Sequence, residues 1–528
     1  MRIQTRPIAG PRLVRDYLSG DASTLELFGV PATDAFGEKA AEVERTFPAD
    51  GRARLARILR GGGGDRDRRL ERFVQEEGFA VTTGQQPGLL GGPLFTLYKA
   101  FSAAALARHL EPELGRPVLP VFWIASQDHD WDEVRRCRLP DLQNELAEVA
   151  LPEGIPPHSF HIPDLGAELS RARDQLLEQL PDSDFAPEYR ALLEGSHGRG
   201  GTLAEAEARL LEGLLAHAGI FILTPEHPEA ADTAAPVLLE EARHALEREE
   251  ALHRRGRELE AAGHELQVPL LAQGLNLFLR TEEGRERLFR AGDGPFRTRK
   301  SGLTLSLDDL EARVRERPAD LTPNVLLRPV VESALVPTLA YMAGPGESAY
   351  FPQTVPLFEA AGRTPPVVRP RLSGFVLESK VEKVLEKFGL EIDELDRPFH
   401  EIAGALAREE MPADLRQALG ALRGEIARGT RTLAEAVEAL DPTLKGTVDG
   451  VRRQGFSALD DVEKKITQAI KREAEVAHAQ VQKAQLHLFP LGVAQERVIS
   501  PFYYLFRYGP AFLTAIEEAA TSVVKGDR

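Results

Sequence analysis

Three residues that follow a long apolar run, Asp128, His129 and Asp130, combine the side chains that acid–base chemistry uses. A histidine titrates near neutral pH, and a neighbouring carboxylate can fix the orientation of its ring. Acidic residues also suit the first turn of a helix, but that accounts for Asp132 and Glu133 better than for His129. A metal site is a further interpretation, yet side chains alternate along an extended chain, so three consecutive residues do not face one ion. We predict that Asp128, His129 and Asp130 are catalytic and that no metal is bound.

A glycine-rich stretch, Val81–Pro93, reads VTTGQQPGLLGGP and lies earlier in the chain. The apolar run at 78–82 predicts a short buried strand, and a helical pattern begins at Leu94. In α/β proteins a strand, a glycine-rich loop and a helix hold ligands, because free N–H groups at the helix N-terminus face an anion or polar substrate. A plain connection is the alternative, but such connections need only about two to six residues. The chain has no Walker A sequence, which excludes a P-loop.

Basic residues later in the chain are candidates for binding an anionic substrate. Arg328 interrupts an apolar run at 324–332 that we interpret as a core strand, and a buried arginine must be paired or face a ligand. Arg369 and Arg371 end a last core strand at 366–371, and Lys99 follows the glycine-rich stretch. Each can pair with a carboxylate. The alternative is a structural or solvated charge, which for Lys99 is the favoured interpretation.

Composition limits the class of protein. The 528 residues carry a formal net charge of −17, which argues against a nucleic-acid-binding protein but allows arginines to bind an anionic small molecule in one pocket. The single cysteine, Cys137, excludes an intrachain disulfide and fits the reducing cytoplasm, where we expect this protein. The longest apolar run, near 118–125, is too short to cross a bilayer. We therefore expect that the protein binds neither a membrane nor a nucleic acid.

The elements that must position these residues predict an α/β core. Continuous apolar runs at 117–125 and 219–225 are typical of strands buried on both faces of a parallel sheet. Two stretches differ from this pattern, one polar and proline-rich and one with a β-hairpin at 275–280 and 286–290. We expect core segments at 1–140, 216–262 and 323–372, and insertions at 141–215 and 263–322.

Helical sequence dominates the C-terminal part. Residues 456–488 contain no glycine or proline and carry an apolar stripe, and a helix of that length needs a partner. We predict an antiparallel helical arm or coiled coil at 373–490 that forms a dimer contact. The aromatic tail at 491–528 is expected to pack on the core or the arm.

Several motifs together resemble the family of bacillithiol biosynthesis cysteine-adding enzymes, which are cysteine ligases. The resemblance rests on Thr83–Pro93, on the 120–125 strand with Asp128–Asp130, and on Leu327–Pro329, Gly344–Glu347 and 496–504, in the same order. It covers essentially the whole chain. One departure is Gln127, where the family usually has an acidic residue, which puts a role for a carboxylate there in doubt.

The resemblance implies a Rossmann-like parallel-sheet core interrupted by two connective insertions, followed by a helical coiled-coil domain used for homodimerisation. It also implies that the chain joins cysteine by an amide bond to the amine of glucosaminyl malate, the last step of bacillithiol synthesis. ATP with Mg²⁺ is the expected co-substrate, without a tightly bound cofactor. Candidate substrate- or nucleotide-binding residues are Gly84, Gln85, Gln86, Gly88, Lys99, Trp131, Arg328, Gly344, Gly346, Glu347, Arg369 and Arg371.

Two other functions fit the same residues. One is another Rossmann-like enzyme, a nucleotidyl- or glycosyltransferase acting on a sugar. The other is a non-catalytic coiled-coil assembly protein. The motif Asp128-His129-Asp130 at a strand end favours an enzyme.

Overall fold

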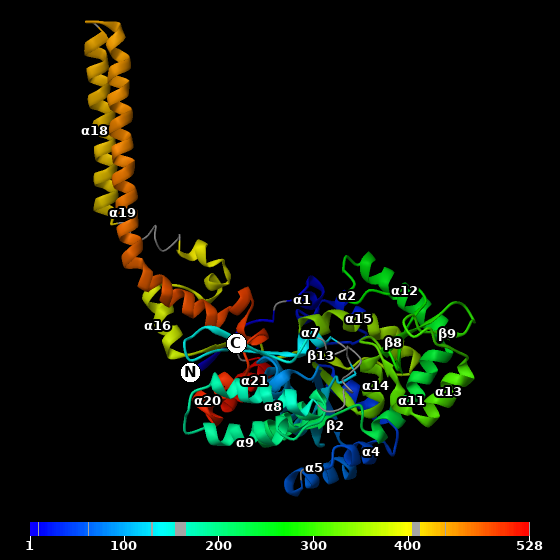
Figure 1. The fold of residues 1–528 in the computed structure, drawn as a ribbon. Coiled ribbons are helices and arrows are strands. Elements are labelled where there is room, and N and C mark those ends of the chain that lie inside the picture. Colours follow the sequence, from blue (N-terminus) through cyan, green and yellow to red (C-terminus); the bar gives the residue numbers. More distant parts are fainter. Residues whose placement is uncertain are drawn as a thin grey trace. The chain divides into compact units, whose positions relative to one another are not determined.

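We describe the fold from a computed structural model, which covers residues 1–8, 10–61, 63–127, 130–153, 165–403, 412–438 and 440–526. These residues form two compact units, one of residues 2–376 with 496–528 and one of residues 377–495 with Met1 (Figure 1). The first unit contains the sheets and the second consists of helices. Asp128 and His129, predicted as catalytic, lie outside the described residues.

A five-stranded parallel sheet is the centre of the first unit. Its order is β13-β12-β2-β3-β6, and every neighbouring pair is parallel. The strands are β2 (Phe79–Gln85), β3 (Val118–Ile124), β6 (Phe221–Leu223), β12 (Thr338–Ala343) and β13 (Val367–Pro370). The chain starts in the middle at β2, builds outward through β3 and β6, and returns to the other side with β12 and β13. This order confirms the predicted Rossmann-like fold and places the reversal of strand order between β2 and β12.

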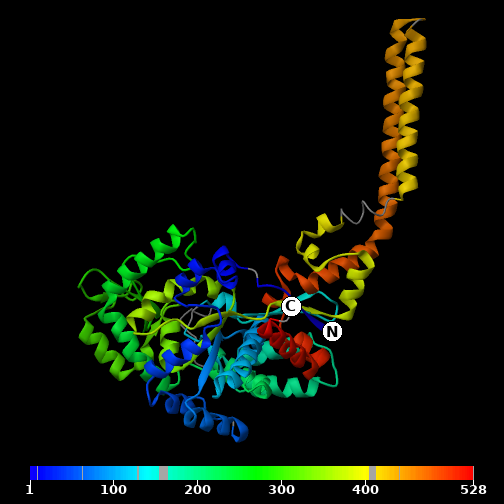
Figure 2. The ribbon, with the colours of Figure 1, turned by 180° about the vertical axis from the view of Figure 1, so that it is seen from behind.

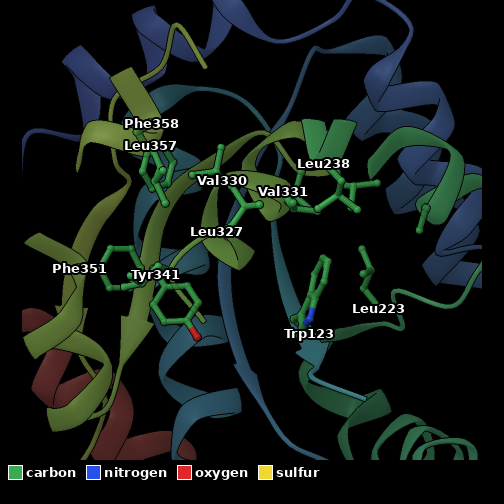
Figure 3. Packing of buried hydrophobic residues seen from close by; sticks show 14 of the residues in the cluster. Trp123, Leu223, Leu238, Leu327, Val330, Val331, Tyr341, Phe351, Leu357 and Phe358 are labelled. Carbon is green, nitrogen blue, oxygen red and sulfur yellow. The ribbon is translucent and has the colours of Figure 1, made fainter. Parts of the chain in front are cut away.

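Both faces of this sheet are buried, because alternate residues of each strand enter different cores. On one face Phe79 and Val81 pack with α3 (Phe36–Thr46) and α6 (Phe95–Leu114). On the other face Ala80 packs in a larger cluster with α11 (Pro228–Arg243), α14 (Arg328–Leu335) and α15 (Pro345–Ala360). Figure 3 shows this second cluster, in which the ring of Tyr341 lies beside Phe351.

The remaining elements of this unit surround the sheet. The chain before β2 holds β1 (Arg2–Thr5), α1 (Arg12–Leu18), α2 (Ala22–Phe28), α4 (Gly51–Ile58) and α5 (Gly64–Gln75). Between β3 and β6 lie α7 (Trp131–Val134), the hairpin β4 (Arg136–Pro140) and β5 (Leu146–Ala150), α8 (Gly166–Glu178), α9 (Ala186–His197) and α10 (Leu203–Leu215). The tail forms α20 (Phe502–Tyr508) and α21 (Pro510–Lys525), and α21 packs along α6, as expected for a tail that returns to the core.

A second five-stranded sheet lies between β6 and β12 in the chain, in the order β10-β9-β8-β7-β11. Its strands are β7 (Gly274–Thr281), β8 (Gly284–Arg290), β9 (Phe296–Arg297), β10 (Thr304–Leu305) and β11 (Leu321–Pro323), with α12 (Ala245–Ala261) and α13 (Leu307–Glu316) beside them. Strands β7 and β8 are antiparallel and confirm the predicted hairpin, with a shorter turn than expected.

The strand predicted at 324–332 is wrong. Asn324 ends the preceding segment by accepting the N–H groups of Leu326 and Leu327 on its side-chain oxygen, and helix α14 begins at Arg328. Pro329 then suits the first turn, where its missing N–H is not needed. The core strand of this region is β12, which the sequence pattern does not predict.

The helical unit contains α16 (Ser379–Phe388), α18 (Ala413–Glu438) and α19 (Lys445–Leu488). Figures 1 and 2 show α18 and α19 side by side as a long hairpin, the predicted coiled coil. The second helix is longer than the predicted 456–488, because it continues through Gly446, Gly450 and Gly455. A Cβ at Gly455 would lie 3.1 Å from Ile426 of α18, so glycine allows close packing there. No helix in the described ranges is both long and apolar enough to cross a bilayer.

Candidate functional site

The glycine-rich stretch begins inside the sheet. Strand β2 extends through Gln85, and a Cβ at Gly84 would lie 2.8 Å from the carbonyl oxygen of Trp123 on β3. Glycine is therefore required for the close pairing of these two strands. The turn that follows has left-handed backbone at Leu90 (φ 54°), Gly91 (φ 86°) and Gly92 (φ 62°).

Helices α9 and α10 hold this turn. The N–H of Leu90 donates to Nε2 of His197 at 3.3 Å, and the N–H of Gly91 donates to Oε2 of Glu207 at 3.2 Å. Burial lowers the pKa of His197 to about 3, so its ring is a neutral acceptor, and burial raises the pKa of Glu207 to about 8. These two N–H groups are bound within the protein, contrary to the expectation that the turn offers them to a ligand.

A cleft of about 570 Å³ opens where β2 and β12 end, at the reversal of strand order. Ligands bind at this position in open parallel sheets. Its described lining includes Gly84, Gln85, Gln86, Phe95, Lys99, Trp123, Gln127, Glu133, Phe278, Arg285, Arg287, Asn324, Arg328, Tyr341, Gly344, Gly346, Glu347, Tyr350, Arg371 and Arg497. One lysine and five arginines thus face two glutamates in a protein of net charge −17.

Lys99 and Glu347 link the two strand ends. The Lys99 ammonium contacts Glu347 Oε2 at 2.6 Å, the carbonyl oxygen of Gly84 at 2.7 Å and Gln85 Oε1 at 2.9 Å. Glu347 also accepts from the Tyr341 hydroxyl at 2.6 Å and from the N–H of Gly344 at 2.8 Å, which caps helix α15. All three ammonium protons are thereby used inside the protein.

The pKa values of this pair follow from burial and mutual attraction. Burial lowers the pKa of Lys99, although Glu347 opposes the effect. Burial alone would raise the pKa of Glu347, but the Lys99 charge and the hydrogen bonds outweigh it and hold the pKa below its usual value. We conclude that Glu347 is ionised at neutral pH and that this pair fixes the geometry of the cleft floor.

Arg328 and Arg371 each have a buried carboxylate partner. Arg328 pairs with Glu332 one turn along α14, and its guanidinium lies 5.2 Å from the centre of the Tyr341 ring. Arg371 contacts Glu496 at 2.9 Å. Burial raises the pKa of Glu332, although the charge of Arg328 opposes the effect. Both cations line the cleft and are also held in place by the protein.

Other predicted residues lie elsewhere. Asp130 accepts from the N–H of Glu133 as the N-cap of α7, and the Trp131 indole donates to the carbonyl oxygen of Pro152. Arg369 donates to the carbonyl oxygen of Thr33 and does not line the cleft. Gly88 lines an adjoining cavity of about 310 Å³.

The sequence interpretation missed the contribution of the second sheet. The cleft is also lined by Phe278, Arg285 and Arg287, which lie on the paired strands β7 and β8. These strands are far in the sequence from the core motifs. The alternation of arginine at 285 and 287 places both on one face of β8, and that spacing was the available signal. Tyr341 was missed because β12 was not assigned.

Two family models together match almost the whole chain. Residues 1–372 match the model described as "Bacillithiol biosynthesis BshC, N-terminal Rossmann-like domain", and residues 374–525 match "Bacillithiol biosynthesis BshC, C-terminal coiled-coil domain". Both descriptions agree with the two folds observed here.

Curated relatives align with this chain over most of their length. A protein of Salinibacter ruber named "Putative cysteine ligase BshC" is 33% identical over 85% of this chain and 82% of its own. A protein of the same name in Koribacter versatilis is 34% identical over 84% of this chain and 82% of the relative. Another in Solibacter usitatus is 29% identical over 94% of this chain and 93% of the relative.

Proposed function

The chain belongs to the bacillithiol biosynthesis BshC family, and from this premise we propose that it is a ligase that joins L-cysteine to glucosaminyl malate. The bond formed is an amide between the cysteine carboxyl group and the sugar amine, and the product is bacillithiol. This would be the last step of its biosynthesis, carried out in the cytoplasm.

The observation that carries this proposal is the cationic cleft at the switch point of a Rossmann-like sheet. Glucosaminyl malate carries carboxylates and ATP carries phosphates, and the cleft concentrates positive charge within an acidic protein. The amides of Gln85 and Gln86 provide neutral donors and acceptors that suit a sugar.

Amide formation from a carboxylate needs an activated carboxyl group. We propose ATP, with Mg²⁺, as the co-substrate that supplies this activation, and no tightly bound cofactor. The amine nitrogen then attacks the activated carbonyl carbon, the phosphate-bearing group leaves, and the nitrogen loses a proton. We propose His129 as the base that takes this proton, oriented by Asp128 or Asp130, on the strength of the residue types alone.

The Lys99–Glu347 pair has a positioning role in this proposal. Since each ammonium proton has a protein partner, Lys99 acts by holding Gly84 and Gln85 against the start of α15. The exposed first turn at Gly346 then offers backbone N–H groups and a partial positive charge to an anionic substrate.

We propose that the helical arm forms a homodimer. Helix α18 has no buried residue, and large apolar side chains on the hairpin are exposed, including Leu422 (51%), Leu433 (48%) and Val451 (53%). Isolated exposed leucines are ordinary, but a series on one long hairpin indicates a surface that another helix pair covers.

The cellular test is the thiol content of a host that lacks this chain. We expect bacillithiol to disappear and glucosaminyl malate to accumulate, measured by mass spectrometry of alkylated extracts. Re-expression of the chain should restore bacillithiol, and a His129→Ala, Asp130→Ala variant that folds should not. Normal bacillithiol levels in the deletion host would show that another protein carries out the reaction.

A further inference from the structure

Arg287 differs from the other deep cations of the cleft. Among the residues that the structure describes, no carboxylate lies within 4 Å of it, whereas Lys99, Arg328 and Arg371 each contact one. Burial lowers the pKa of Arg287, and no acidic group counters that effect. A partly desolvated cation without an anion is costly, so such a group in a cleft indicates an anionic ligand.

The protein holds Arg287 in a fixed position without neutralising it. Its Nη1 donates to the carbonyl oxygen of Leu275 at 2.9 Å, and its guanidinium lies 4.8 Å from the centre of the Phe278 ring, its cross-strand partner. Arg285 lies over the same ring at 4.0 Å and donates to Pro323 and Thr322. Two rigid strands therefore support this cationic face.

The geometry of the guanidinium favours one class of ligand. With Nη1 bound to a carbonyl, the adjacent edge formed by Nε and Nη2 has no hydrogen-bond partner among the described residues. That edge presents two parallel N–H groups, which match the two oxygens of a carboxylate.

We propose that Arg287 binds a carboxylate of the acceptor substrate, so that the segment between β6 and β12 selects a glucosaminide bearing an acidic group. This inference rests on the proposed function and assigns the malyl end of the acceptor to the second sheet. The sugar amine would then lie toward the core strands, where the activated carboxyl group is expected.

The test is equilibrium binding to the full chain, measured by calorimetry, with glucosaminyl malate, methyl glucosaminide and ATP as separate ligands. Arg287→Met should weaken binding of glucosaminyl malate by about 10- to 100-fold, the usual effect of one charged hydrogen-bonded pair. Binding of methyl glucosaminide, which has no carboxylate, and of ATP should not change. Arg287→Lys keeps the charge but loses the paired N–H groups. Its affinity for glucosaminyl malate should lie between those of the wild type and Arg287→Met.

Arg290→Met is the matched control. Arg290 is on the same strand, donates to the carbonyl oxygen of Gly294 and lies 4.9 Å from the Phe296 ring, but it does not line the cleft. It should bind glucosaminyl malate as the wild type does.

Three results would overturn the inference: unchanged binding of glucosaminyl malate by Arg287→Met, an equal loss for methyl glucosaminide, or a loss confined to ATP, which would identify a phosphate site. Failure of the proposed function is a separate result. It would appear as wild-type protein that binds glucosaminyl malate but forms no amide product.

Discussion

Glu347→Gln should destabilise the first unit strongly, because it removes one charge of a buried pair and little else. Glutamine has nearly the same shape and can still cap the N–H of Gly344, so the helix start is preserved. The Lys99 ammonium is left with neutral partners, the Gly84 carbonyl and the Gln85 amide. Breaking a buried pair from one side costs about 3–5 kcal/mol. Since the Glu347 side chain is 21% exposed, we expect about 2–4 kcal/mol.

The double variant Lys99→Met, Glu347→Gln tests the cause. With no unpaired charge left, it should recover most of the stability lost by Glu347→Gln, because replacing both partners of a buried pair is often close to neutral. Urea unfolding followed by tryptophan fluorescence measures this directly, since both tryptophans of the chain, Trp123 and Trp131, belong to the first unit.

The pH dependence gives an independent check on the same pair. The pKa of Glu347 is lowered on folding. Its contribution to the free energy of unfolding is therefore present above the unfolded carboxyl pKa and is lost as the pH falls through the folded pKa. The wild type should therefore lose its advantage over Glu347→Gln in acid. A cost below about 1 kcal/mol at pH 7, or a double variant no more stable than the single one, would refute the role assigned to the pair.

Two further predictions concern other parts of the chain. The pKa of Glu207 is raised to about 8 on folding. The contribution of this group to the free energy of unfolding is therefore fully present below the unfolded carboxyl pKa and is lost as the pH rises through about 8. The stability of Glu207→Gln relative to wild type should therefore increase by on the order of 4 kcal/mol between pH 4.5 and 9 in urea titrations, and a flat difference would contradict the buried state of this group. On the arm, Leu422→Lys with Val451→Glu should convert a dimer to a monomer by light scattering without loss of helical circular dichroism, and an unchanged mass would exclude this face as the contact.

The sequence predicted the fold well where hydrophobic pattern alone decides the structure. Strands β2, β3 and β6 are short apolar runs buried on both faces, and the helical arm has a long apolar stripe. The errors occurred at 324–343. There Asn324 acts through its side chain to start a helix, and β12 holds small and aromatic residues that local pattern does not assign to a strand.

The candidate site was predicted in part. Residues next to the ends of β2 and β12 meet at one cleft, because parallel strands end on the same edge of the sheet. What the sequence did not show is which charges are already paired. Lys99 and Arg371 contact Glu347 and Glu496, which are distant in the chain, and Arg287 enters the cleft from a separate sheet. These pairings depend on tertiary contacts that no local pattern encodes.

Reconstitution with an isotope-labelled acceptor shows directly whether this protein joins cysteine to glucosaminyl malate. Purified protein is incubated with L-cysteine, ATP, Mg²⁺ and glucosaminyl malate labelled with ¹⁵N at the amine, and the products are analysed by mass spectrometry. We predict a cysteinyl product that carries the ¹⁵N in an amide bond and whose formation depends on this protein. If cysteine and the labelled acceptor remain unjoined while the protein is folded and binds both, the assignment as a cysteine ligase is wrong.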